Sequence, residues 1–179
     1  ALEAYNVQQD LELHTHASAE AQVAALSDDI AYNNHDLHDG LRAGLFSEEE
    51  ISGLPLVSEA YAEVDRLYPQ VDAYRRRHEA LRRVFGVMVT DVLDVSRKRL
   101  ERAACAGPQD IRDLGRPVIA FSDDLRQALR EIRAFLFQNM YRAPQVMAQR
   151  EQVTRVVQDL FPIYMADPLL LPRRWQDDI

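Results

Sequence analysis

The chain has 179 residues, of which 21 are basic and 29 are acidic, so its formal net charge at pH 7 is -8. This length suits one domain, or one domain with a small appendage, and allows a buried core without disulfides. The negative charge argues against nucleic-acid binding through the whole surface, although a local basic patch remains compatible with it. A single cysteine excludes a disulfide framework and a cysteine-rich zinc module. Without an apolar run long enough for a membrane span, and without a signal peptide, the sequence predicts a soluble cytoplasmic protein.

The first half of the sequence has a helical period of apolar residues, which predicts an all-α fold. Residues 1–17 should form an irregular lead-in, and a helix should run from Ser18 to Ala43, where Gly44 ends it. Ser47 with Glu50 has the capping-box pattern that opens a short helix. Another helix is expected over residues 55–67.

The second half continues this pattern around one long helix, which brings the expected total to six or seven helices. The long helix should cover residues 72–104, about 50 Å at the usual rise per residue. Residues 108–121 should connect it to the next helix, and residues 117–121 are the only candidate for an extended segment. Ser122 should begin a helix that reaches residue 142, and Pro144 a last helix that reaches residue 166. The tail after residue 166 should be irregular.

One side of the first long helix carries an acidic stripe. Asp28, Tyr32 and Asp36 follow one another at i, i+4 and i+8, with Asp39 beside them and Arg42 as the only nearby cation in the sequence. The two outer carboxylates of this trio are about 12 Å apart along the helix axis, too far to share one proton or one metal ion. A solvated acidic surface is one interpretation. The other is that a positive group, such as a divalent cation, compensates the stripe.

The residues of this stripe resemble a known family. Asp28-Asp29-Ile30-Ala31-Tyr32 followed by Asp36 is similar to the bacterial deoxynucleoside triphosphate (dNTP) triphosphohydrolases, or dGTPase-like proteins, of the HD superfamily. Stretches within residues 39–44, 86–92 and 135–146 are similar as well, so the resemblance spans most of the chain. It implies a multi-helix, HD-associated helical domain. Residues 1–45 would be the last part of the HD core, and residues 46–179 the phosphohydrolase-associated helical domain.

The resemblance also implies roles for individual residues. Asp28 matches a direct ligand of the family's divalent metal ion, which would be Mg, Mn or similar. Tyr32 and Asp36 match residues that hold the deoxyribose of the substrate, and Tyr141 resembles a pocket residue from a later helix. Where relatives usually carry a histidine, this sequence has Ala143.

The family's other metal ligands, a histidine and a His-Asp pair, have no counterpart before Asp28. The pair His35-Asp36 follows Asp28 and is therefore in the wrong order. The chain thus resembles the C-terminal portion of such an enzyme, without the N-terminal HD core, and the isolated portion should be inactive because one aspartate cannot hold a catalytic metal. The parent enzyme would convert a dNTP to a deoxynucleoside and triphosphate, as a homo-oligomer. Two alternatives remain: a non-enzymatic helical binding or regulatory module, and an HD phosphohydrolase acting on another phosphate ester.

Three further signals have a functional and a structural interpretation. His14, His16, His35 and His38 could form a second metal site, or could simply be exposed. The arginine-rich runs at residues 75–77, 82–83 and 97–99 could contact nucleotide phosphates or single-stranded DNA, or form a solvated face interleaved with acidic residues. Cys105 has no base beside it in the sequence and is expected to be inert.

Overall fold

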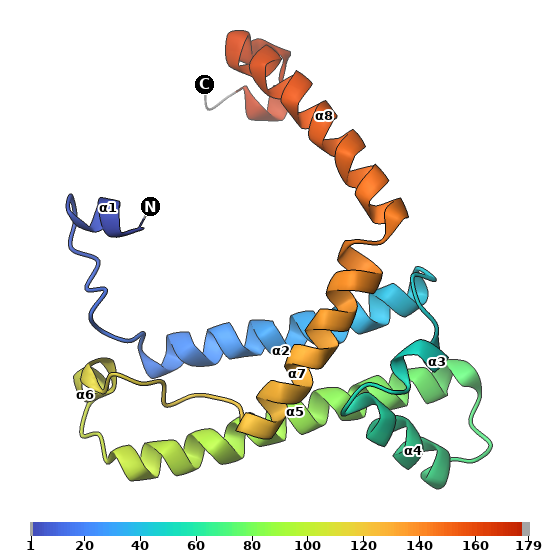
Figure 1. Cartoon of the computed structure of the whole chain (residues 1–179). Helices are drawn as coiled ribbons and strands as arrows, with labels where there is room; N and C mark the ends of the chain where they lie inside the picture. Colours follow the sequence, from blue (N-terminus) through green and yellow to red (C-terminus); the bar gives the residue numbers. More distant parts are fainter. Residues whose placement is uncertain (1, 177–179) are drawn as a thin grey trace. The chain divides into compact units, whose positions relative to one another are not determined.

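The computed structural model describes residues 2–176, and every regular element within that range is helical. The predicted all-α class is therefore confirmed, and α5, with 31 residues, is the longest of the described helices, ahead of α2 with 24 (Figure 1). In chain order the elements are α1 (Leu2–Asn6), α2 (Ala19–Arg42), α3 (Glu48–Ile51), α4 (Val57–Leu67), α5 (Ala73–Ala103), α6 (Pro108–Asp113), α7 (Asp123–Leu136), η1 (Phe137–Tyr141), α8 (Pro144–Ala166), η2 (Pro168–Leu170) and η3 (Arg173–Trp175). No helix in this range is long and apolar enough to cross a membrane.

Helix α2 begins and ends where the sequence predicts. The Ser18 side chain accepts a hydrogen bond from the amide of Ala21, and Gly44 leaves the helix with a φ of +65°, which glycine adopts without strain. Gly40 is needed for another reason: a Cβ atom there would lie 2.2 Å from the ring of Phe46. That ring packs edge-on against Phe135 of α7, with 5.1 Å between ring centroids. The end of α2 is thereby held against the core.

Helix α5 is the spine of the first unit. Asp72 caps its N-terminus by accepting from the amide of Arg75, and its apolar face buries Leu81, Val84 and Met88. Helix α4 packs on its first half, and α2 lies beside it in the antiparallel direction (Figure 1). The predicted capping box at Ser47 is present at the start of α3.

The predicted extended segment at residues 117–121 is not part of a strand within the described residues, yet it is largely buried. Side chains of two helices accept hydrogen bonds from its backbone amides. Gln22 Oε1 accepts from Val118 and Ile119 at 2.9 and 3.1 Å, and Ser96 Oγ accepts from Ala120 at 3.2 Å. Three consecutive amides of this segment are therefore satisfied without a sheet.

Four local expectations were wrong. The segment before residue 18 contains the short helix α1, and the tail contains the turns η2 and η3. Residues 108–121 were expected only to connect two helices, but they begin with helix α6. This helix starts at Pro108, because proline suits a first helical position and the Asp110 side chain accepts hydrogen bonds from the amides of Ala106 and Gly107. The helix from Ser122 does not stay α-helical to residue 142, since the chain continues after Leu136 as the π-helical turn η1.

The chain divides into two compact units, with the boundary between Leu136 and Phe137. In the second unit, α8 has no buried residues, and the Gln176 side chain donates to the carbonyls of Leu169 and Leu171 to hold the tail turns together. The boundary predicted between residues 45 and 46 remains a prediction.

Candidate functional site

Three of the four predicted site residues lie on α2 and differ in burial. Asp28 is exposed, Tyr32 is 58% exposed, and Asp36 is only 9% exposed. Ala25 and Ala21, about one and two turns before Asp28, are also exposed. The acidic stripe therefore runs from an uncovered face near the middle of α2 toward the packed second half of the helix.

The face opposite Asp28 and Tyr32 forms the core. Ile30, Leu37 and Leu41 are at most 8% exposed, because this side of α2 packs against α5 and α7. Since the buried face fixes the rotation of the helix, Asp28 and Tyr32 must point away from the core. A carboxylate and a phenol in this position are able to contact a ligand or another segment of protein.

A cation that the sequence did not reveal lies next to the stripe. Arg133 of α7 places Nη2 3.2 Å from Asp29 Oδ2, and its Nε donates to Asn33 Oδ1 at 3.2 Å. Arg42 is the only cation near the stripe in the sequence, but in the folded chain Arg133 is also close to it. Arg133 is 104 positions beyond Asp29, so no i, i+4 rule detects the pair. It compensates Asp29 and leaves the Asp28 carboxylate facing outward.

Tyr141, the fourth predicted site residue, belongs to the second unit. It is half-buried at the end of η1, two residues before Ala143, which is buried. The π-helical turn changes the direction of the side chains after Leu136, and simple α-helical projection does not predict their faces.

The histidines do not form the second metal site considered above. Among residues 2–176 no group of three or more histidine, cysteine, aspartate or glutamate side chains could hold a metal ion. The His38 ring instead lies 4.9 Å from the ring of His78, centroid to centroid, and the His78 ring lies 4.3 Å from that of Tyr74. The Nδ1 atom of His38 is 3.5 Å from Asp39 Oδ1. These rings border a cavity of about 830 Å³ between α2 and α5.

The arginines at the start of α5 bind acidic residues of neighbouring helices. Arg76 makes a two-pronged contact with Asp65 of α4 and a 3.0 Å bond to Glu48 of α3, while Arg77 donates to the same Glu48 at 2.8 Å. The hydrogen bond from Arg76 lowers the pKa of Asp65. Burial raises the pKa of Tyr61, whose ring lies under Arg76, to about 12. This cluster joins three helices.

Comparison with known proteins relates the chain to one family. Residues 119–179 match the phosphohydrolase-associated domain. Over all 179 residues the chain is 58% identical to a deoxyguanosinetriphosphate triphosphohydrolase-like protein of Cereibacter sphaeroides and 56% identical to one of Ruegeria sp.. It is 43% identical over 176 residues to a protein of the same name from Parvibaculum lavamentivorans. The chain spans about half the length of these relatives, 44–47%, and corresponds to their C-terminal part, so the resemblance predicted from the Asp28–Asp36 block is confirmed.

Proposed function

Because the chain is related over its whole length to the C-terminal part of deoxyguanosinetriphosphate triphosphohydrolase-like proteins, we propose that it is the C-terminal portion of a metal-dependent dNTP triphosphohydrolase. The parent hydrolase would convert a dNTP to a deoxynucleoside and triphosphate. A homo-oligomer and a cytoplasmic location belong to the same proposal. The observation that carries it is the outward face of α2, where Asp28 and Tyr32 are exposed beside two small residues, Ala21 and Ala25.

Asp28 suits the role of one metal ligand. Its carboxylate is an oxygen donor of the kind that Mg and Mn prefer, and Arg133 binds the neighbouring Asp29 instead. A bound divalent ion would supply a Lewis acid for a phosphate oxygen and lower the pKa of a coordinated water. The remaining ligands would come from the part of the parent protein outside this chain, and the chain alone should therefore be inactive.

Tyr32 and Asp36 suit recognition of the sugar. Tyr32 lies one turn beyond Asp28, and its exposed ring offers an apolar surface and a hydroxyl to a deoxyribose. Asp36 lies a further turn along the same side, and burial at the core holds its carboxylate in a fixed place. The family resemblance assigns Tyr141 to the substrate pocket as well.

Substitution of Asp28 in the full-length parent protein tests the proposal. Asp28→Asn removes the charged oxygen ligand with almost no change in volume, so we expect metal content to fall and kcat/KM for dNTPs to drop by more than about a hundredfold. The measurements are metal per chain by mass spectrometry and release of triphosphate. The 179-residue chain alone should release none.

Asp39→Asn is the matched control. Asp39 lies on the same helix and the same acidic side, its side chain is 60% exposed, and the substitution changes the charge by the same amount. Metal content and turnover should stay near the wild-type values. Retention of metal and activity in Asp28→Asn would contradict the metal-ligand role. A full-length protein that binds no metal and hydrolyses no dNTP would instead favour the non-enzymatic module.

A further inference from the structure

A pocket at the C-terminal end of α5 is lined by three arginines and no acidic residue. Its volume is about 400 Å³, and its walls are Arg99, Arg102, Leu114, Arg116, Pro117 and Val118. Two of the guanidinium groups come from α5, and the third comes from the loop that follows α6. This concentration of positive charge occurs in a chain whose formal net charge is -8.

The pocket has one fixed and two available arginines. Arg99 is half-buried, and its Nη1 donates to the carbonyl of Pro117 at 3.0 Å. Arg102 and Arg116 are exposed, and neither forms an ion pair with another residue in the described range. The guanidinium groups of Arg102 and Arg116 are therefore available to bind an anion, while that of Arg99 is held by the Pro117 carbonyl in the pocket wall.

The backbone that carries Arg116 is well fixed. Gly115 has a φ of +68°, which turns the chain immediately before Arg116. Two residues later, the amides of Val118 and Ile119 are bound to the Gln22 side chain of α2. The arginine from the loop is thus held between a glycine turn and an anchored segment, so its backbone requires little ordering on binding.

Two aspartates of α6 are engaged in local hydrogen bonds. Asp110 of α6 accepts from the amides of Ala106 and Gly107, and Asp113 accepts from Gln109. Attraction to the carbonyl end of α5 explains a basic residue in its last turn, such as Arg102. It does not explain Arg116, which lies outside the helix.

We propose that this pocket binds a small phosphate-bearing anion, with Arg102 and Arg116 as direct ligands and Arg99 as the residue that fixes their surroundings. Guanidinium groups bind phosphate oxygens through paired hydrogen bonds, and several phosphates in one compact anion match several arginines. The pocket volume lies within the roughly 300–1,000 Å³ that is usual for small-molecule sites. The site is separate from Asp28 and does not depend on the proposed hydrolysis.

Isothermal titration calorimetry with the 179-residue chain tests this site, with inorganic triphosphate and orthophosphate as the probes, at about 150 mM salt to screen diffuse charge. We expect triphosphate to bind with a stoichiometry of one and more tightly than orthophosphate. Arg102→Ala and Arg116→Ala should each weaken triphosphate binding by about tenfold or more, because each removes charge-assisted hydrogen bonds. Asp28→Asn should leave it unchanged, which separates this site from the proposed metal site.

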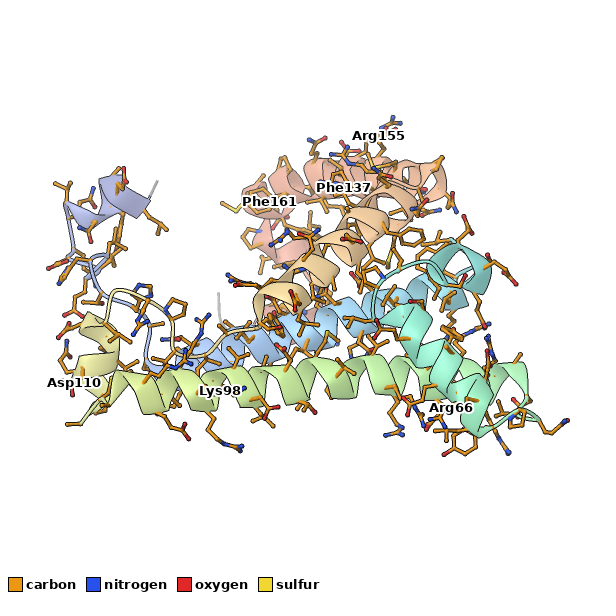
Figure 2. The ribbon with its side chains drawn as sticks, turned by 60° about the horizontal axis from the view of Figure 1, so that its bottom comes forward. Arg66, Lys98, Asp110, Phe137, Arg155 and Phe161 are labelled. Atoms are coloured by element: carbon orange, nitrogen blue, oxygen red, sulfur yellow. The ribbon has the colours of Figure 1, made fainter. Side chains whose placement is uncertain are left out.

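Two control variants distinguish the pocket from diffuse charge. Lys98 is an exposed cation on α5 that does not line the pocket, and Arg66 is an exposed arginine of α4. Figure 2 shows Lys98 and Asp110 toward one end of the first unit and Arg66 toward the other. Lys98→Ala and Arg66→Ala should change affinity by less than about twofold, since exposed charges are well screened.

Three outcomes would overturn the proposal. The first is equal weakening by Lys98→Ala, which would indicate diffuse charge. The second is no detectable triphosphate binding. The third is Arg116-dependent binding of a single-stranded oligonucleotide when triphosphate does not bind, which would assign the arginines to a nucleic-acid backbone. Tenfold weakening confined to the two pocket variants would support the site.

Discussion

The two ends of α5 use arginine in opposite ways. At the N-terminal end, Arg76, Arg77 and Arg83 bind the carboxylates of Glu48, Asp65, Glu63 and Glu79. At the C-terminal end, Arg99 binds a backbone carbonyl, while Arg102 and Arg116 have no acidic partner in the described range. The sequence is rich in arginine at both ends, so composition alone does not separate the two arrangements.

The difference arises from what packs beside each end. Helices α3 and α4 bring acidic side chains to the first turns of α5, and three helices become joined by charge-assisted hydrogen bonds. The loop at residues 114–118 brings apolar side chains and carbonyls to the last turns instead. Arginine is therefore structural at one end and available at the other, and each variant below tests one side of this contrast.

Loss of Arg76 should have the largest effect on stability. Arg76→Ala leaves Asp65 and Glu48 without their shared partner and removes a guanidinium from the Tyr61 ring, 4.5 Å away. We expect the free energy of unfolding to fall by about 1–2 kcal/mol, since the partners are partly exposed and screened by solvent. Urea denaturation of the chain measures it. Arg75→Ala is the control, because Arg75 is 80% exposed and, among residues 2–176, forms an ion pair only with Asp72. An equal loss in both variants would contradict the structural role.

Glu79 should make the N-terminal end sensitive to acid. Hydrogen bonds from Arg82 and Arg83 lower its pKa from 4.5 to about 2 in the folded chain. A lowered pKa means that this stabilisation is present above about pH 4.5 and is lost as the pH falls toward 2. Glu79→Gln should be less stable than the wild type at neutral pH, and the difference should shrink on acidification. Denaturation curves between pH 2 and 6 check this.

Arg102→Ala serves as the control for the acid profile, because it changes an arginine at the other end of the same helix. It should keep the wild-type dependence of stability on pH. A difference between wild type and Glu79→Gln that stays constant over the whole range would show that the Glu79 charge is not the cause.

The sequence predicts most of this fold because many of its signals are local. Ser18, Ser47 and Asp72 cap helices through bonds to residues three positions ahead, and Gly44 ends α2 with its own backbone conformation. The π-helical turn after Leu136 was not predictable in this way, since it depends on packing beyond the nearest turns.

In the candidate site, too, local features follow from the sequence and contacts between distant segments do not. The stripe of Asp28, Tyr32 and Asp36 follows from helical spacing, and its differing exposure follows from the buried face opposite. The Asp29–Arg133 pair and the Arg99–Arg102–Arg116 pocket are contacts between distant segments, and spacing does not reveal them. The roles of Asp28, Tyr32, Asp36 and Tyr141 stay predictions until the parent protein is tested.

The smallest effect on stability is expected at the C-terminal end, where it separates the two uses of arginine most clearly. Arg102→Ala and Arg116→Ala remove exposed cations without acidic partners, so the free energy of unfolding should change by no more than about 0.5 kcal/mol in either direction. Triphosphate should raise the Tm of the wild type, because a ligand of the native state stabilises it by mass action. At the same concentration it should raise the Tm of either variant by less. A loss of stability as large as that of Arg76→Ala, without triphosphate, would mean that these arginines hold the fold together. The contrast between the two ends of α5 would then fail.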